Sequence, residues 1–307
     1  MSGVKIGIGF GQWKYGLPEP ESFCHYAETA EAVGLDSIWL SDHIVTRNPT
    51  IDITCLFSMI AARTRRIKMG PSVLTLPARH PVHVAKTYAA LDYISNGRMI
   101  MAVGSGSDVR DLEASGVSPK ERGKRLDEGI KILRRLWTES NVTHHGDFYH
   151  FDNVTIEPKP RKGSLDIWIG GKSDAILKRV VRLGDGWFPA LTSPAEFRRD
   201  MDKLMAFGEE YGRKMNPREA GVLLLTHIDE DRDAAWKTVA PSIRGLPMPP
   251  EDLGARCLVG PASECVEKIH QFIEAGCSKF VLRPACPLPD IMSQIELYGS
   301  KILPQFA

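Results

Sequence analysis

The sequence has no long hydrophobic run and no strong excess of charge of either sign. No stretch reaches eighteen apolar residues, and the first residues, MSGVKIGIGFGQWKYG, lack the apolar stretch of a secretory signal peptide. The formal net charge is +1, which argues against nucleic acid or an acidic membrane surface as the main partner. We therefore expect a cytoplasmic protein, not bound to a membrane, that acts on a small molecule.

Cysteine is also scarce, and its spacing is not that of a metal or disulfide site. None of the six cysteines belongs to a Cys-x-x-Cys pair, and most stand in apolar contexts such as TCLF and RCLVG, so we expect reduced core thiols. Two groups of histidines, within 80–83 and 144–150, have no cysteine or clear Glu-x-x-His partner nearby. No metal site is expected at either.

What the sequence does contain is an alternation of apolar runs and helical patterns. The runs are rich in Val, Ile, Leu and Phe, as strands buried on both faces are. Eight of them predict strands: 5–10, 37–42, 67–74, 98–104, 166–171, 186–190, 221–228 and 279–284. This order predicts an α/β fold, a (β/α)8 TIM barrel. An open doubly wound sheet is the weaker alternative, because both Gly-x-Gly sequences lack the third glycine of its G-x-G-x-x-G fingerprint.

Local signals predict where several helices begin. Ser22 is positioned to cap a helix over 23–33. Ser118–Glu121 and Ser193–Glu196 each have the spacing of a capping box with proline at the first helical position. These signals predict three helix starts.

We expect a single domain over 1–307. The length alone permits two domains, but α/β barrels reach this size as one. Residues 139–165 hold alternating strand-like pieces and a Pro-Lys-Pro sequence, which predict a small hairpin inserted between the fourth and fifth strands.

The barrel prediction also locates the chemistry, because the site of such a fold lies at the carboxyl ends of its strands. The rule nominates residues after seven of the eight predicted strands. They include Trp13, Asp42, His43, Ser72, Val73, Leu74, Gly104, Ser105, Gly106, Gly170, Gly171, Lys172, Ser173, Trp187 and Arg283.

Residues 170–173, Gly-Gly-Lys-Ser, join the fifth strand to a helix. Paired glycines let backbone N–H groups approach a ligand, the helix N-terminus carries partial positive charge, and Lys172 adds a full one. A bound phosphate explains all four residues. An ordinary strand-to-helix turn explains Ser173 as an N-cap, but not the glycine pair or Lys172. The segment by itself favours the phosphate only slightly.

Asp42 and His43 follow the second strand. A histidine at this position can exchange a proton near neutral pH, and the adjacent carboxylate can orient it. In the alternative interpretation Asp42 caps a turn and His43 is purely structural. Arg283, after the last strand, suits either the binding of an anion or the tethering of the last loop.

Taken in order, the motifs resemble the luciferase-like family, which includes bacterial luciferase and many deazaflavin-dependent oxidoreductases. The resemblance extends over nearly the whole chain. It rests on AEAVGLDSIWLSDHI (30–44), GPSVLTLPARHPVHVAKTYAALDYISNGRMIMAVGSG (70–106), RLDEGIKILRRLWTE (125–139), GDFYHFDNVTIEPKP (146–160), IWIGGKSDAILKRVVRLGDGWFP (167–189) and AGCSKFVLRP (275–284).

This resemblance implies a flavin-type cofactor. In the family the cofactor's phosphate rests at the turn that matches residues 170–173. The ring lies against a bulge of the third strand, here Ser72 to Leu74, and deazaflavin-using members have a non-prolyl cis peptide there that matches Ser72–Val73. Gly104, Ser105 and Gly106 would line the ring or its side chain, and His43 would lie near the reactive part of the ring.

The resemblance also implies a substrate side. Trp13, Trp187 and Arg283 would face the substrate, and the segments 107–118 and 139–165 are lid candidates. Sugar-phosphate dehydrogenases of the family have a tryptophan and a glutamate where this chain has Arg47 and Ser107, so no sugar-phosphate substrate is expected.

The resulting hypothesis is an oxidoreductase in which coenzyme F420 exchanges hydride with a small organic substrate and His43 handles the proton. The alternative is an FMN-dependent monooxygenase that uses reduced flavin and oxygen. Two further alternatives are a barrel lyase or isomerase that binds a substrate phosphate at the glycine turn, and a non-catalytic flavin-binding protein. Family members are often homodimers, so a homodimer is expected.

Overall fold

The computed structural model describes residues 3–11, 13–46, 48–244, 246 and 250–306. Arg47, one of the two departures from the sugar-phosphate dehydrogenases, lies outside the described residues. Within them, none of the helices combines the length and the apolarity needed to cross a membrane.

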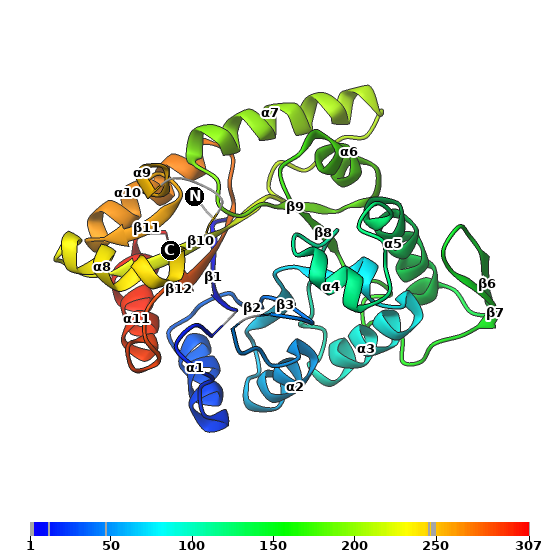
Figure 1. Ribbon diagram of the computed structural model, residues 1–307, viewed down its shortest axis with the longest axis horizontal. Helices are drawn as coiled ribbons and strands as arrows, with labels where there is room; N and C mark the ends of the chain where they lie inside the picture. The colour runs from blue at the N-terminus through cyan, green and yellow to red at the C-terminus, as the bar shows by residue number, and fades with distance from the viewer. Residues whose placement is uncertain (1–2, 12, 47, 245, 247–249, 307) are drawn as a thin grey trace.

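Parallel strands occupy the centre of the molecule, and helices surround them (Figure 1). Each of the eight predicted strands is confirmed, with most of them shortened by a few residues. They are β1 (Lys5–Phe10), β2 (Ser37–Leu40), β3 (Lys68–Pro71), β5 (Met101–Gly104), β8 (Ile167–Gly170), β9 (Gly186–Phe188), β10 (Gly221–Ile228) and β12 (Lys279–Pro284).

The strands follow one another around a ring. Six form the order β11-β10-β12-β1-β2-β3, and four form the order β4-β5-β8-β9. Parallel bridges join the two sheets, from Met69 to Met99 on one side and from Trp187 to Ala220 on the other. The chain therefore has the predicted (β/α)8 barrel fold, with its strands in sequence order around the ring.

Two short strands add to the eight. β4 (Leu74–Thr75) continues the third strand beyond Ser72 and Val73 and pairs with β5. β11 (Cys257–Gly260) pairs with the carboxyl half of β10. β11 is not among the predicted strands, because a four-residue apolar run is too short to be told from a loop or a helix segment by its pattern alone.

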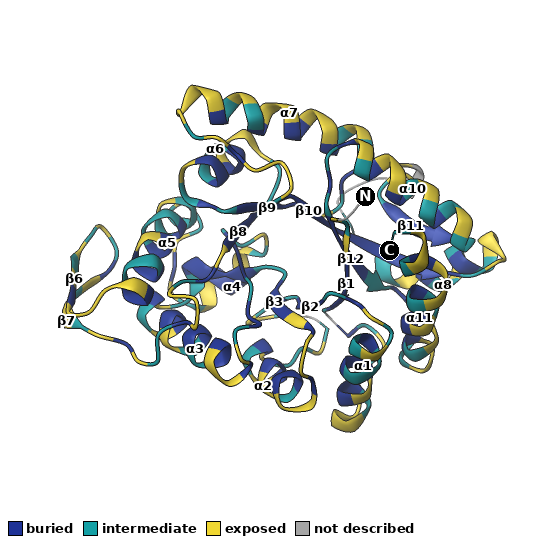
Figure 2. Ribbon diagram, turned by 180° about the vertical axis from the view of Figure 1, so that it is seen from behind, coloured by how far each residue is buried: buried dark blue, intermediate teal, exposed yellow. Residues whose placement is uncertain are grey.

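The helices form the outer layer, and their exposed faces point outward while the strands are buried (Figure 2). The helices are α1 (Pro20–Ala32), α2 (Ile53–Arg63), α3 (Pro81–Ile94), α4 (Val109–Ala114), α5 (Arg122–Thr138), α6 (Asp174–Leu183), α7 (Pro194–Glu210), α8 (Arg232–Ile243), α9 (Pro250–Leu253), α10 (Ala262–Glu274) and α11 (Ile291–Leu297).

Two of the three predicted helix starts are wrong. α1 begins at Pro20, upstream of Ser22, because a proline whose fixed φ suits the first helical position can begin a helix without a side-chain cap. α5 begins at Arg122. Ser118 lies before it in a turn, in which the Ser118 carbonyl accepts the N–H of Glu121 at 3.0 Å. The third prediction is confirmed, since Ser193 and Glu196 form a reciprocal capping box at α7.

Residues 139–165 contain the predicted hairpin, formed by the antiparallel strands β6 (Val142–His145) and β7 (His150–Val154). It projects from the body of the molecule beside α5 (Figure 1). His144 Nε2 lies 3.0 Å from Glu128 of that helix, which fastens the turn end of the hairpin. None of the described residues in this segment lines the barrel cavity, so the expectation of a lid is wrong for 139–165.

Large side chains fill the inside of the barrel. Trp39 and Phe188 have ring centroids 4.7 Å apart, and Trp168 packs beside both. Below them Lys279 is buried, with its ammonium 3.1 Å from Asp36 and 5.3 Å from the Trp39 ring. The barrel is therefore a packed core whose open end lies above these rings.

The α7 cap provides a test of stability. Burial raises the pKa of Glu196, but hydrogen bonds from Arg256 and from the Ser193 N–H outweigh it and bring the pKa to about 2. Because this pKa is lower than that of an unfolded glutamate, the stabilisation is present above about pH 4.5 and is lost as the pH falls towards 2. We expect Glu196→Gln to reduce the free energy of unfolding at pH 7 by about 1–3 kcal/mol in urea denaturation.

Glu139→Gln is the matched control, since Glu139 forms an exposed i,i+4 pair with Arg135. That change should alter stability by less than about 0.5 kcal/mol. Two outcomes would contradict the stabilising role of ionised Glu196. One is an equal loss of unfolding free energy in the two variants, and the other is a loss in Glu196→Gln that is as large at pH 3 as at pH 7.

Candidate active site

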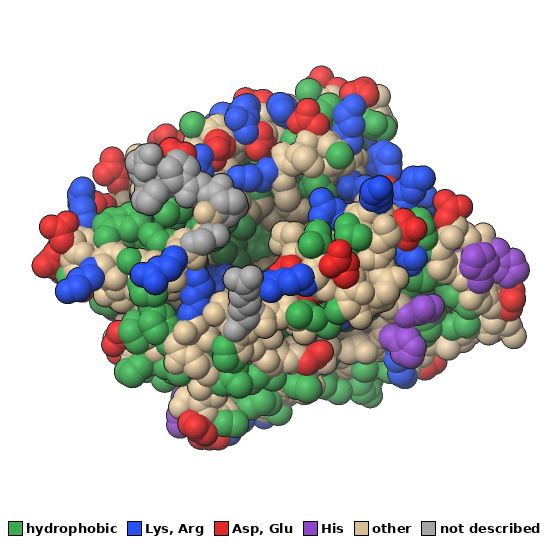
Figure 3. Space-filling view, in the orientation of Figure 1, with side chains coloured by type: hydrophobic (Ala, Val, Ile, Leu, Met, Phe, Trp, Pro, Cys, Tyr) green, Lys and Arg blue, Asp and Glu red, His purple; other side chains and the backbone are tan. Residues whose placement is uncertain are grey.

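A cavity of about 850 Å³ opens at the carboxyl ends of the strands. Its size is that of a site for a cofactor or a drug-sized ligand. Figure 3 shows the hollowed face, with Lys and Arg side chains gathered around it. Of the residues nominated from the sequence, the lining includes Trp13, Asp42, His43, Ser72, Val73, Gly104, Ser105, Gly106, Gly170, Gly171, Lys172, Ser173 and Arg283.

Trp187 does not line the cavity, so the prediction that it faces the substrate is wrong. Side chains alternate along β9, and it is Phe188 that points into the barrel mouth. Trp187 points the other way, is fully buried, and packs on Phe197 of α7 with ring centroids 4.8 Å apart. Its indole N–H donates to the carbonyl of Gly171 at 2.8 Å, so it supports the glycine turn from outside the cavity.

Leu74 also lies outside the cavity, which corrects its assignment to the cofactor. Its side chain is fully buried in the main hydrophobic core. The neighbouring Thr75 lines the cavity instead. The reason is again the alternation of side chains along an extended segment.

The peptide bond between Ser72 and Val73 is cis, as the resemblance implies. Val73 projects between two glycines of the neighbouring strands. A Cβ on Gly104 would lie 2.6 Å from one methyl of Val73, and a Cβ on Gly170 would lie 2.9 Å from the other. The glycines therefore make room for Val73 on the cavity wall. The Ser72 hydroxyl beside it is buried and has no hydrogen-bond partner among the described residues.

The glycine turn between β8 and α6 has the geometry of an anion site. Gly171 has φ of +119°, which favours glycine, and the Ser173 hydroxyl caps α6 by accepting the N–H of Ile176 at 3.4 Å. Lys172 lines the cavity and donates to the carbonyl of Leu191 at 2.7 Å, which leaves further donor capacity on its ammonium. Backbone amides, helix N-terminus and ammonium thus meet at one point of the cavity wall.

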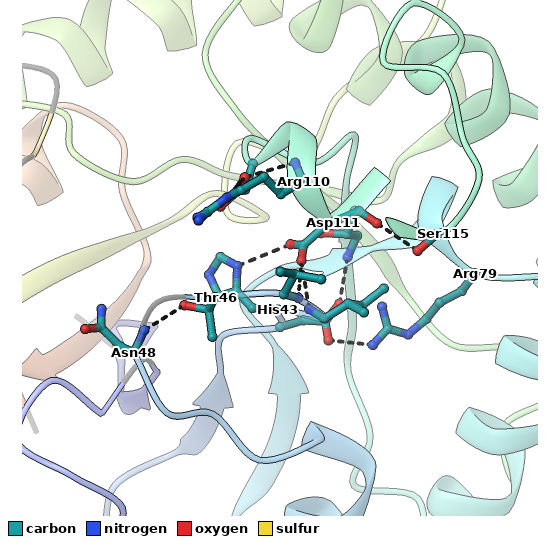
Figure 4. A network of polar contacts seen from close by, with 12 residues as sticks. His43, Thr46, Asn48, Arg79, Arg110, Asp111 and Ser115 are labelled. Carbon is teal, nitrogen blue, oxygen red and sulfur yellow. Dashed lines mark hydrogen bonds and ion pairs between the residues drawn. The ribbon is translucent and has the colours of Figure 1, made fainter. Parts of the chain in front are cut away.

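His43 is oriented by a carboxylate that its sequence neighbourhood does not reveal. Asp111 reaches it from α4, with its Oδ2 3.3 Å from His43 Nδ1 (Figure 4). The other oxygen of Asp111 accepts the N–H groups of Ile44 at 2.9 Å and Val45 at 2.7 Å. The buried carboxylate therefore fixes the loop and favours the His43 tautomer with hydrogen on Nδ1, in which Nε2 is the acceptor.

Asp42 does not orient His43, which corrects the sequence prediction. Its Oδ1 forms an ion pair with Arg79 at 2.8 Å, and its Oδ2 accepts the N–H of Thr75 at 3.1 Å. Burial raises the pKa of Asp42, while the charge of Arg79 opposes that shift. The carboxylate ties the end of β2 to the segment after the cis peptide, so its role is structural support of the cavity wall.

The orienting role of Asp111 can be tested with asparagine, a side chain of the same size and shape. In Asp111→Asn one oxygen can still accept the two backbone N–H groups, but an NH2 group faces His43 and favours the opposite tautomer. We expect turnover to fall about 10²-fold with cofactor affinity unchanged. NMR of the His43 ring nitrogens should report the change of tautomer, which a loss of stability alone would not produce.

Asp152→Asn is the control, because Asp152 forms a comparable pair with His145 at 2.8 Å on the exposed hairpin. Turnover should not change in that variant. An unchanged His43 tautomer in Asp111→Asn would contradict the positioning role.

The fold and the cavity define a TIM-barrel protein with a glycine turn at a helix N-terminus and an oriented histidine at the carboxyl ends of its strands. Residues 2–279 match the family model of the luciferase-like monooxygenases. The chain belongs to this family.

Two named relatives are a dehydrogenase and a reductase. The chain is 34% identical over 210 residues to an F420-dependent glucose-6-phosphate dehydrogenase of Amycolatopsis mediterranei, a match that covers 66% of this chain and 61% of that enzyme. It is 24% identical to a 5,10-methylenetetrahydromethanopterin reductase of Archaeoglobus fulgidus, over 92% of this chain and 94% of the reductase.

Solved structures have the same fold. An F420-dependent secondary alcohol dehydrogenase in complex with an F420-acetone adduct matches with a TM-score of 0.87 and 20% identity, over 99% of both chains. The oxygenating constituent of 3,6-diketocamphane monooxygenase of Pseudomonas putida, a type II Baeyer-Villiger monooxygenase in complex with FMN, matches with a TM-score of 0.83 and 17% identity, also over 99% of both chains.

Proposed function

We propose that the protein is an oxidoreductase that uses coenzyme F420 to exchange hydride with a small organic substrate. The observation that carries the proposal is the arrangement of one cavity, in which the glycine turn of α6, the Val73 wall and the oriented His43 all face the same space. The F420-dependent activity in the name of the Amycolatopsis relative supports the choice of cofactor.

The residues present fit such a cofactor. Gly171, Lys172 and Ser173 would hold its phosphate, and Val73 with Gly104 would bear the ring. The buried hydroxyl of Ser72, which has no partner among the described residues, offers a hydrogen bond to a polar edge of the ring. Bound F420 would supply the hydride chemistry that no amino-acid side chain provides.

The chain's own part in the reaction is to orient the substrate and to move a proton. Hydride transfer to a carbonyl leaves an alkoxide that needs a proton, and the reverse reaction must remove one. His43 Nε2 is the group we assign to this transfer, because Asp111 holds the opposite edge of the ring. The packed side chains beneath the cavity exclude water from the inner side of the site.

An FMN-dependent monooxygenase is the second candidate. It is favoured by the fold match to a monooxygenase that contains FMN. In that case reduced FMN would occupy the same cavity and react with oxygen, and its phosphate would use the same turn.

Binding of the two cofactors separates these candidates. Purified protein is titrated with oxidised F420 and with FMN, and fluorescence is followed. We expect saturable binding of F420 with an affinity at least tenfold higher than that of FMN. Binding of FMN alone would replace the proposed hydride transfer by the monooxygenase reaction.

We infer further that the protein acts in the cytoplasm as a homodimer. Support for a dimer comes from the resemblance and from Tyr93 and Ile94 at the end of α3, which are about half exposed although they are large and apolar. Sedimentation equilibrium should give the mass of two chains, and a monomer across the micromolar range would refute the dimer.

A further inference from the structure

Arg283 is a cation in the cavity wall that has no partner among the described residues. It lies at the carboxyl end of β12, is half-buried, and makes no hydrogen bond or ion pair with any residue that the structure describes. A Cβ on Gly11 would lie 2.5 Å from its Nη2 and 2.8 Å from the Ser41 hydroxyl. The guanidinium therefore occupies space that only a glycine at position 11 leaves open. Burial lowers the pKa of Arg283, and no acidic group contributes an opposing shift.

A second cation lies on the same side of the cavity. Lys14 lines the cavity, and its ammonium donates to the carbonyls of Pro241 at 3.1 Å and Ser242 at 2.8 Å. Burial, and then the charges of Arg283 and Arg244, lower the pKa of Lys14. Like charges held together in this way raise each other's electrostatic energy, and an anion between them would lower it.

The carboxylates of the cavity do not supply that anion. Among the lining residues that the structure describes, they are Asp42, Asp108 and Asp111. Asp42 is paired with Arg79, Asp108 with Arg110, and Asp111 with backbone N–H groups and His43. These carboxylates therefore leave the charges of Arg283 and Lys14 unneutralised, and an anionic ligand would neutralise them.

This cation pair is separate from the turn at Lys172. Around the ring of strands, β9 and β10 lie between β8, which leads into that turn, and β12, which carries Arg283. A phosphate at the glycine turn therefore leaves Arg283 and Lys14 still without an anion. One cavity thus has two places that favour negative charge.

We propose that the substrate carries an oxyanion, a carboxylate or phosphate group, that binds between Arg283 and Lys14 while its reacting carbon faces the cofactor and His43. This inference rests on the proposed function. A guanidinium matches the two oxygens of such a group with parallel hydrogen bonds, and the Lys14 ammonium adds a point charge. The pair would then select anionic over neutral substrates and set their orientation.

The test uses protein loaded with F420 and two simple oxyanions as probes. Inorganic phosphate and malonate are titrated by calorimetry into the wild-type protein and into Arg283→Gln, Lys14→Gln and Arg283→Lys. We expect saturable binding of at least one probe by the wild type, about tenfold weaker in each glutamine variant, as for the loss of a charge-assisted hydrogen bond. Arg283→Lys should bind with intermediate affinity. Thermal unfolding verifies that each variant is folded.

Arg198→Gln is the matched control, since Arg198 is exposed and outside the cavity. It removes the same charge and should leave anion binding unchanged. If Arg283→Gln lowers the affinity for F420 by the same factor, Arg283 and Lys14 bind an anionic part of the cofactor and the proposal is wrong. Absence of anion binding by the loaded wild type also overturns it. Failure of F420 to bind the wild type overturns the proposed function instead, and titration of the unloaded protein then tests the cation pair by itself.

Discussion

Replacing His43 with glutamine should lower turnover by about 10²–10⁴-fold, the range associated with the loss of a general acid or base. Glutamine keeps a side chain of similar length and polarity in the cavity wall, so the affinity for F420 should change little. The experiment compares turnover under saturating cofactor with the dissociation constant from a fluorescence titration.

His83→Gln is the control for the histidine substitution. His83 is exposed at the start of α3 and does not line the cavity. Its variant should retain full turnover. If an active wild-type enzyme and His43→Gln turn over at the same rate, His43 is structural and the assigned proton transfer is wrong, although the fold and the cofactor assignment remain.

Replacing Gly104 with alanine should weaken cofactor binding by about 10- to 100-fold, which corresponds to about 1.4–2.7 kcal/mol. The added Cβ would lie 2.6 Å from a methyl group of Val73, so the valine must shift. We expect the displaced Val73 to enter the space that the ring occupies. The same fluorescence titration measures the effect.

Gly254→Ala is the matched control, because a Cβ there has no neighbour within 4 Å and its φ lies outside the left-handed region. Its F420 affinity should equal that of the wild type. If the Gly104→Ala protein binds F420 as tightly as the wild type does, the ring does not bind against Val73.

Much of the fold could be predicted from local sequence. The eight strands are apolar runs of the length and composition that buried parallel strands require, and the Ser193–Glu196 box and the Ser173 cap depend on residues three positions apart. Such signals need no knowledge of tertiary structure. The helix starts predicted at Ser22 and Ser118 are wrong. Near Ser22 a proline begins the helix earlier, and after Ser118 a turn delays its start.

The errors in the site have a different origin. The sequence places Asp42 beside His43, but the side chains diverge, and the partners Arg79 and Asp111 come from segments 37 and 68 residues away. No spacing rule links such residues. Trp187 was assigned to the wrong face, because a three-residue strand does not show which of its side chains points inward until its neighbours are known.

A crystal structure of the protein with oxidised F420 would show whether the glycine turn of α6 holds the cofactor's phosphate. We expect electron density for a phosphate on the N–H groups of the Gly171–Ser173 turn and for a ring against Val73, within reach of His43. Density for the phosphate at another place, with the turn closed by side chains, would contradict this expectation.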